Sequence, residues 1–255
     1  VQLPLIVNPT PVATTPVDYH ICDDNYDGFG IFNLTTLNSE ILGSLSSTTH
    51  SVTYYTSLLN AQTGVSPITT VTAFPNTIFH SQPLWAVVTI LATGCTDIVT
   101  FNVVVDPLPQ ATQPAYAPYS LCETSAFGVG FESFDLEGQE SGILLGQTGM
   151  SVTFYPSLLL AQNNTGAIAT PSYVNTAIYV QTLGIRITND ATGCFVVSTI
   201  DIRVNPLPTP IPLTGAFTLC DTDQNGQSVF DLCSLTADID PSGSYVISYH
   251  ETQTD

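Results

Sequence analysis

Short segments of alternating apolar and polar residues fill most of the chain. In the first hundred residues they are Val17–Ile21, Gly30–Leu34, Ser51–Tyr55, Thr77–His80, Trp85–Leu91 and Asp97–Val105. They are rich in Val, Ile, Thr, Tyr and Phe, and turn residues separate them at short intervals. This pattern is typical of an antiparallel β-sandwich rather than of alternating strands and helices. Two further stretches, Thr36–Leu42 and Ser57–Gln62, predict short helical turns, the second opening on a serine cap.

The same pattern returns at an interval close to 100 residues. Asn8-Pro9-Thr10-Pro11 recurs as Asp106-Pro107-Leu108-Pro109 and Asn205-Pro206-Leu207-Pro208, at steps of 98 and 99 residues (8 to 106, 106 to 205). The segments 51–62 and 151–162 are identical at nine of twelve positions. A period of this length fits an independent domain rather than a short solenoid repeat.

The proline motifs define the expected domain boundaries. Residues 1–8 align with 99–106 and predict the last strand of a preceding repeat. Residues 9–106 and 107–205 predict two complete β-sandwich repeats, and 206–255 the N-terminal half of a further one. Because Pro-x-Pro segments favour extended backbone, we expect tandem immunoglobulin-like domains, all-β with short helical turns, joined by Pro-rich linkers into a rod.

Charge excludes several kinds of partner. The net charge is −19, with Arg186 and Arg203 as the only basic residues. Nucleic-acid binding requires a basic surface, and an anionic bilayer would repel this one. No apolar run reaches the roughly 18 residues of a membrane span, so we expect neither nucleic-acid binding nor membrane insertion.

Cysteines recur in step with the repeat. An early cysteine follows each proline motif, at Cys22, Cys122 and Cys220, and a late one ends the motif Ala-Thr-Gly-Cys at Cys95 and Cys194. One early and one late cysteine per unit predict a disulfide within each domain, Cys22–Cys95 and Cys122–Cys194, and hence an oxidising compartment. Buried free thiols or metal ligands are the alternative. The partners of Cys220 and Cys233 remain open.

An acidic loop follows the early cysteine in the first and third units. Both Asp23-Asp24-Asn25-Tyr26-Asp27-Gly28 and Asp221-Thr222-Asp223-Gln224-Asn225-Gly226 fit the pattern of a Ca²⁺-binding loop, with oxygen ligands at alternate positions and a glycine for the turn. The candidate ligands are Asp23, Asn25, Asp27, Phe29, Asn33, Asp221, Asp223, Asn225, Gln227 and Asp231. An ordinary acidic turn is the alternative, and Glu123–Gly128 of the second unit lacks most of these oxygens.

Catalytic patterns are missing from the sequence. The four histidines show no metalloprotease spacing, and there is neither a phosphate-binding loop nor a nucleophile elbow. Tyr54, Tyr55, Phe79 and Trp85 could stack on sugars, but their alternation within strands favours core packing. We therefore do not expect an enzyme.

Taken together, the motifs resemble a known family. Units reading N-P-x-P, C-D-D-N-x-D-G-F, V-T-Y-Y-x-S-L-x-N-A-Q and A-T-G-C are similar to the repeats of giant flavobacterial cell-surface adhesins of gliding motility. The resemblance implies export by the type IX secretion system, display on the cell surface, and attachment to a surface or polysaccharide substratum. Its implied partners are neighbouring repeats and the secretion and gliding machinery. A glycan-binding module and an accessory stalk of a secreted enzyme are the alternative functions.

Overall fold

The computed structural model describes residue 3 and residues 5–124, 126–169 and 171–251. In the first repeat the elements are β1 (Tyr19–Cys22), β2 (Ile31–Phe32), η1 (Leu34–Leu37), α1 (Asn38–Leu42), β3 (His50–Tyr55), α2 (Leu58–Thr63), β4 (Phe74–Pro75), β5 (Ser81–Ile90) and β6 (Thr96–Asp106). In the second they are β7 (Tyr119–Cys122), β8 (Ser133–Asp135), η2 (Glu137–Gln139), α3 (Glu140–Leu144), β9 (Met150–Tyr155), α4 (Leu158–Asn163), β10 (Ser172–Val174), β11 (Val180–Asn189) and β12 (Phe195–Asn205).

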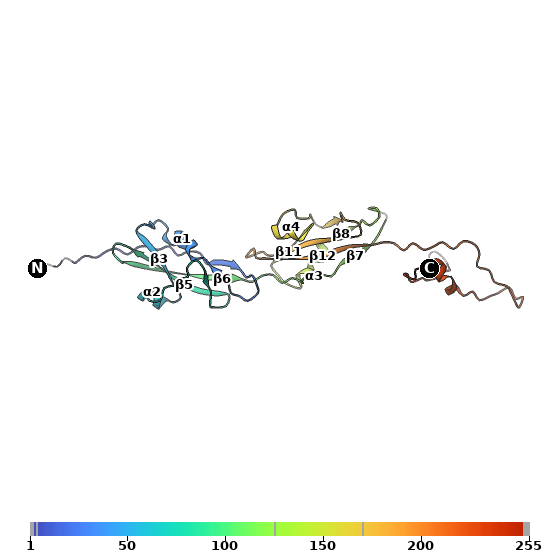
Figure 1. Cartoon of the computed structure of the whole chain (residues 1–255), viewed down its shortest axis with the longest axis horizontal. Helices are drawn as coiled ribbons and strands as arrows, with labels where there is room; N and C mark the ends of the chain where they lie inside the picture. The colour runs from blue at the N-terminus through green and yellow to red at the C-terminus, as the bar shows by residue number, and fades with distance from the viewer. Residues whose placement is uncertain (1–2, 4, 125, 170, 252–255) are drawn as a thin grey trace. The chain divides into compact units, whose positions relative to one another are not determined.

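Both repeats share one strand topology, which confirms the predicted all-β, sandwich-like fold with short helical turns. The first contains a four-stranded sheet in the order β1-β6-β5-β3 and a two-stranded sheet, β2-β4. The second repeats this as β7-β12-β11-β9 and β10-β8. The strands β3, β5 and β6 lie side by side in Figure 1.

One strand pairing departs from the antiparallel expectation. The long strands β5 and β6 pair antiparallel, as do β3 and β5. In contrast, β1 runs parallel to β6, with Tyr19 opposite Val103 and Cys22 opposite Asp106. The second repeat does the same, with Tyr119 opposite Ile202 and Cys122 opposite Asn205. Each early cysteine therefore lies at the C-terminal end of the repeat's last strand.

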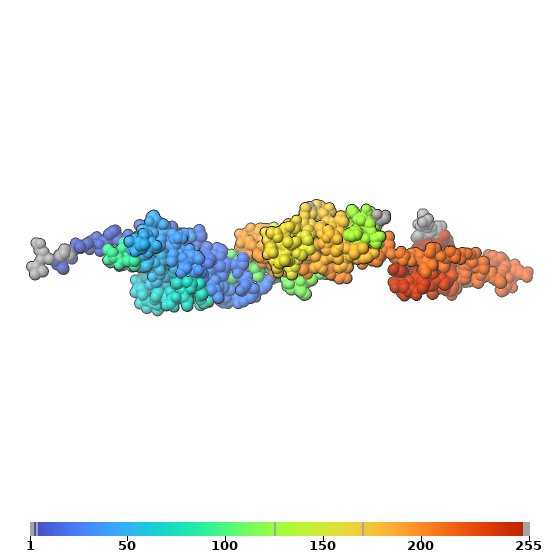
Figure 2. Space-filling view, turned by 45° about the horizontal axis from the view of Figure 1, so that its top comes forward, coloured from blue at the N-terminus to red at the C-terminus, as the bar shows by residue number. Residues whose placement is uncertain are grey.

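Alternation along the strands places the core. On β5 the side chains of Leu84, Ala86 and Val88 are fully buried, and on β6 those of Phe101 and Val103 lie against them. The first repeat, coloured from blue to green, appears as a closely packed surface in the space-filling view (Figure 2). A helical cover over this sheet face contributes Leu34, Leu37 and Ile41. Burial of this apolar surface, at about 25 cal/mol per Å², is the main stabilising term of each repeat.

Tyr54 ties the helical cover to the sheet. Its side chain is 1% exposed, and its hydroxyl lies 2.8 Å from the Leu34 carbonyl oxygen and 2.7 Å from Asn38 Oδ1. Burial raises the pKa of this phenol well above its ordinary value. The tyrosine is therefore a neutral, hydrogen-bonded core residue, as its alternation predicted.

The predicted strand Thr77–His80 is wrong. The second layer instead has the two-residue strand β4, and residues 77–80 form a turn. A side chain forms the hydrogen bond that a neighbouring strand would otherwise make with this segment: Gln82 Oε1 accepts from the N–H of Thr77 at 2.6 Å. His80 also has a positive φ of 61°, which a strand does not allow. Phe79 is 60% exposed, so the core role expected for it is wrong as well.

The flanking segments carry little regular structure. Within the described part of residues 206–255 the regular elements are η3 (Leu232–Leu235) and α5 (Thr236–Ile239), with no strand. They correspond to η1 and α1 of the first repeat. Residues 3 and 5–8 likewise form no strand, although 1–8 were expected to; Val1, Gln2 and Pro4 lie outside the described residues.

Compact units do not follow the sequence repeat. One unit comprises residues 1–117, 135–173 and 182–201, and the other 118–134, 174–181 and 202–255. The first repeat lies wholly within the first unit, whereas the second is divided between the two. The boundaries drawn at the proline motifs therefore stay a prediction from the sequence.

Candidate functional site

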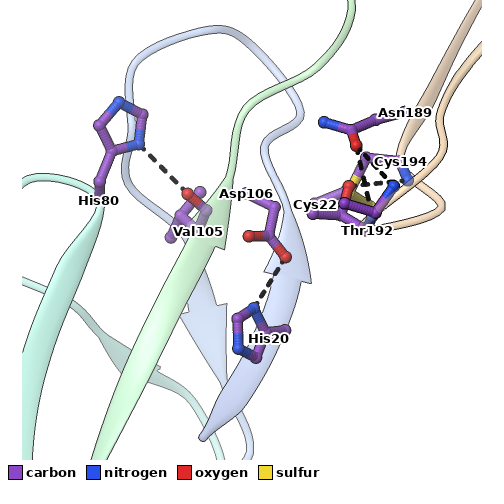
Figure 3. Close-up of polar contacts among 9 residues, drawn as sticks. His20, Cys22, His80, Val105, Asp106, Asn189, Thr192 and Cys194 are labelled. Atoms are coloured by element: carbon purple, nitrogen blue, oxygen red, sulfur yellow. Dashed lines mark hydrogen bonds and ion pairs between the residues drawn. A yellow bond between two sulfur atoms is a disulfide. The ribbon is translucent and has the colours of Figure 1, made fainter. Parts of the chain in front are cut away.

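A disulfide joins the two repeats. Cys22, at the end of β1, is bonded to Cys194, in the hairpin between β11 and β12, with the two Cα atoms 5.5 Å apart (Figure 3). The two residues are separated by 172 positions in the sequence. Both belong to the first compact unit. Disulfides form and persist in oxidising compartments, so this bond points to an exported protein.

The predicted pairs Cys22–Cys95 and Cys122–Cys194 are therefore wrong. Cys95 and Cys122 are free thiols. The reason is the parallel pairing of β1: Cys22 lies opposite Asp106 at the end of β6, whereas Cys95 immediately precedes its first residue. Ten steps of about 3.3 Å separate those ends by roughly 33 Å, and a disulfide requires Cα atoms about 4.4–6.8 Å apart.

The hairpin that carries Cys194 is held by its own polar side chains. Asn189 Oδ1 accepts from the N–H of Ala191 at 3.0 Å, and Thr192 Oγ1 accepts from the N–H of Cys194 at 3.3 Å. Gly193 supplies a left-handed φ of 76°. Cys194 itself is 1% exposed. The motif Ala-Thr-Gly-Cys is thus a turn that fixes the position of the late cysteine.

The same turn is present in the first repeat. Thr93 Oγ1 accepts from the N–H of Cys95 at 3.4 Å, and Gly94 has a φ of 73°. Cys95 is partly exposed, and Cys122 is exposed at the end of β7. Each free thiol therefore occupies the position of one half of the observed disulfide.

Cys22 is positioned by the end of β6. The N–H of Asp23 donates to the Asp106 carbonyl at 2.8 Å. Beside it, His20 Nδ1 lies 2.9 Å from Asp106 Oδ2, and His80 Nδ1 lies 3.2 Å from the Val105 carbonyl oxygen (Figure 3). His20 thus lies on the strand with an exposed side chain whose ring is hydrogen-bonded to the Asp106 carboxylate.

The acidic loop is organised around the carboxylate of Asp23. Asp23 is 4% exposed. Its Oδ1 accepts from the N–H groups of Asn25 and Tyr26, and its Oδ2 from that of Gly28 at 2.8 Å. Burial acts to raise the pKa of this carboxyl, but the backbone N–H groups around it outweigh burial and hold the pKa below its ordinary value.

The other predicted metal ligands make local hydrogen bonds. Asn25 Oδ1 accepts from the N–H of Asp27, and Asp27 Oδ1 accepts from that of Phe29 at 2.8 Å. Asn33, the expected ligand at position eleven, caps η1 by accepting from the N–H of Thr35.

The third unit repeats these contacts. Asp221 Oδ2 accepts from the N–H of Gly226 at 2.8 Å, and Asp223 Oδ1 from that of Asn225 at 3.4 Å. Asn225 Oδ1 accepts from the N–H of Gln227, and Asp231 caps η3. No group of three or more His, Cys, Asp or Glu side chains suited to a metal ion is found among the residues described. Calcium binding therefore stays a hypothesis.

A carboxylate keeps the same place in the second repeat, although the calcium pattern is lost there. Glu123 Oε1 accepts from the N–H of Gly130 at 2.6 Å, as Asp23 does from Gly28. Glu132 accepts from the N–H of Thr124. The longer Glu123 side chain accompanies a loop that is two residues longer. The left-handed glycines Gly28 and Gly130 follow Asp23 and Glu123 by five and seven positions. The hydrogen bonds of the loop are thus kept in the second repeat, although the calcium-loop sequence motif is not.

Sequence reasoning missed the buried asparagine that anchors this loop. Asn76 Oδ1 accepts from the N–H of Gly30 at 2.7 Å, and its Nδ2 donates to the carbonyl of Gly28. In the second repeat Asn175 makes the equivalent bonds to Glu132 and Gly130. Both asparagines are 4% exposed. The available signal was the dipeptide Asn-Thr recurring 99 positions later, at 76 and 175.

The cysteine pairing can be tested chemically. In the folded, unreduced chain, iodoacetamide should alkylate Cys95 and Cys122, whereas Cys22 and Cys194 should react only after reduction. Peptide mapping without reduction should recover one cross-linked pair, Cys22–Cys194. A Cys22–Cys95 peptide in freshly purified protein would contradict the structure.

A second test concerns the Asp23 carboxylate. Because its pKa in the folded chain lies below its ordinary value, the ionised group stabilises the fold above about pH 4, and this contribution is lost as the pH falls through the folded-state value. Asp23→Asn should therefore lower the free energy of unfolding by about 1–3 kcal/mol near neutral pH, and by much less in strong acid.

Trp85, the only tryptophan, reports on the first repeat alone, so its fluorescence during urea unfolding measures this effect. Asp24→Asn, at the exposed neighbouring carboxylate, is the matched control and should change little. If Asp23→Asn lowered the free energy of unfolding by the same amount in acid as at neutral pH, the charge of Asp23 could not be the cause.

None of the helices in the described part of the chain is long and apolar enough to cross a bilayer. Among curated proteins, none matches the sequence.

Similar solved structures are tandem modules. They include Clostridium thermocellum CbhA fibronectin(III)-like modules (15% identity, 61% of this chain and 77% of that one, TM-score 0.27) and Drosophila OTK extracellular domains 3–5 (8%, 76% and 60%, 0.33). Drosophila N-cadherin EC1-3 is a third (12%, 77% and 66%, 0.24). Superpositions this weak leave the fold to be judged from the strand topology alone.

A family match covers both repeats. Residues 18–109 and 118–208 each match the Flavobacterium inter-domain disulphide bond domain. Each match contains the complete four-stranded sheet of one repeat, with its early and late cysteine. Together they span more than half of the chain, and the observed bond connects one copy to the next. The chain therefore belongs to the family of Flavobacterium inter-domain disulphide bond domains.

Proposed function

We propose that the chain is part of the stalk of a bacterial cell-surface adhesin, where it spaces and bears load for attachment during gliding motility. The observation that carries the proposal is the disulfide between successive immunoglobulin-like repeats. A covalent link between neighbouring domains is useful where domains must not separate, as in a load-bearing stalk. Type IX secretion and the substratum enter through the resemblance of the repeats to SprB-like gliding adhesins.

The free thiols extend this arrangement. Cys95 occupies the place of Cys194, and Cys122 that of Cys22. Cys95 would bond the early cysteine of a preceding repeat and Cys122 the late cysteine of a following one, and Cys220 is a third early cysteine. Each repeat would then be bonded to both of its neighbours, which is the partner set of a tandem stalk.

Glycan binding is the weaker alternative. A lectin-like role for the repeats would be favoured by an exposed aromatic at the same position in each. Phe79 is such a residue, 60% exposed and packed edge-on against Phe29, but the second repeat has Ile178 in its place. Tyr54 and Tyr55 are buried. We propose no catalytic role, and a stalk carrying an enzyme would require a catalytic domain elsewhere in the full-length protein.

The proposal can be tested on cells. Cys22→Ser in the flavobacterium that carries the protein should leave the adhesin on the cell surface but reduce attachment under flow severalfold, because the first and second repeats are no longer bonded. Cys233→Ser is the matched control, since Cys233 aligns with Thr35 and belongs to neither cysteine series. Unchanged attachment in cells lacking the whole protein would contradict the adhesive role.

Calcium remains a structural proposal for the first and third units. A Ca²⁺ ion held by Asp23, Asn25 and Asp27 would stiffen a loop that adjoins Cys22. Adding Ca²⁺ to chelator-treated protein should then raise the thermal midpoint seen by Trp85 fluorescence, and Asp27→Asn should abolish the shift. A thermal midpoint that is the same with Ca²⁺ and with chelator would contradict the proposal that the loop binds calcium.

A further inference from the structure

The disulfide offers tension a path that does not pass through most of the folded chain. Cys22 and Cys194 are 172 positions apart in sequence, yet their Cα atoms are 5.5 Å apart. Fully extended, a segment of that length would span roughly 570–620 Å. When the chain is pulled from its two ends, force passes from Cys22 through the sulfur atoms to Cys194. The intervening backbone then bears none of it.

We infer that the inter-repeat disulfide is a mechanical bypass, which keeps the stalk from lengthening even when a repeat loses its fold. The biological use of the bypass rests on the proposed stalk function. The bypass itself follows only from which cysteines are bonded and from where they lie in their sheets.

Nearly all of the first repeat lies inside the bypassed segment. Strands β2 to β6, with the buried side chains of Leu84, Phe101 and Val103, come after Cys22 and before Cys194. The exception is β1, an edge strand of four residues that pairs only with β6. Tension can peel this strand from its N-terminal side, but the peeling stops at Cys22. The first repeat can therefore release only the residues that precede Cys22, namely residues 9–18 and β1.

The second repeat has one strand outside the segment. β12 begins at Phe195, directly after the bonded Cys194, and lies between β7 and β11. It contributes the buried side chains of Ile200, Ile202 and Val204. Under tension β12 is the element that resists, and its removal would open the second sheet. Even then, residues 23–193 remain closed by the disulfide.

The placement of the cysteines makes this bypass nearly complete. The early cysteine is the last residue of its repeat's first strand, and the late cysteine directly precedes the last strand of the next repeat. A bond between an early and a late cysteine of one repeat would bypass one domain. The observed bond spans two, leaving only one terminal strand of each repeat exposed to tension.

Single-molecule stretching of the 255-residue chain tests the inference. Handles are attached at both ends by chemistry that spares thiols. The background carries Ser in place of the four free cysteines, which leaves the disulfide intact and prevents thiol exchange; these are Cys95, Cys122, Cys220 and Cys233. The bonded chain should lengthen only by residues outside the 22–194 segment. Adding Cys22→Ser should release about 300 Å more for each repeat, on the order of 600 Å in total.

Reduction under load gives a second measurement should the Cys22→Ser chain fail to fold. Cys22 is exposed, so dithiothreitol added to the stretched, bonded chain should transfer the force to the two repeats and produce a further extension of about 600 Å in total as they unfold. Equal extension with and without the bond would overturn the bypass. These lengths do not depend on where the protein is displayed, so a failure of the adhesion test would leave this result standing.

Discussion

The parallel pairing of β1 with β6 is the constraint on which the rest of the structure depends. It places Cys22 beside Asp106, at the C-terminal end of an eleven-residue strand whose N-terminal end adjoins Cys95. The same pairing of β7 with β12 separates Cys122 from Cys194. Two cysteines at opposite ends of one long strand cannot meet within a domain, so the bond forms between domains. In the chain-entropy treatment, closing a loop this long stabilises the folded chain by roughly 5 kcal/mol.

The loop after the early cysteine is the second constant of the repeat, and its constancy lies in hydrogen bonds rather than in sequence. A carboxylate one position after the cysteine accepts from the N–H of a left-handed glycine, at Asp23 with Gly28 and at Glu123 with Gly130. A buried asparagine, Asn76 or Asn175, supports the other side of the loop. Buried polar groups must be paired, so this network persists in the second repeat, where the calcium-loop pattern does not. The loop is thereby fixed beside the bonded cysteine with or without an ion.

The two features together suit a protein whose task is mechanical. The core of each repeat is ordinary, built from alternating apolar residues, and gives the domain its shape. The core stabilises each domain separately, whereas the disulfide holds one domain to the next. A chain with a net charge of −19 and two basic residues also has little means of holding its domains together through ion pairs. The disulfide instead holds neighbouring domains together covalently.

The sequence alone determined what depends on local pattern: the repeat of about 98 residues, the alternating strands, the Ser57 helix cap, and the recurrence of one early and one late cysteine per unit. It could not determine which cysteines pair, because spacing of 73 or 72 residues says nothing about strand direction. An antiparallel β1 would have brought Cys22 to the start of β6, near Cys95, and the within-domain bond would have followed. Only the tertiary structure shows that β1 pairs in parallel with β6, and therefore that Cys194 is the partner of Cys22. The turn at residues 77–80 was likewise decided by the side chain of Gln82 and the conformation of His80, which compete successfully with strand pairing.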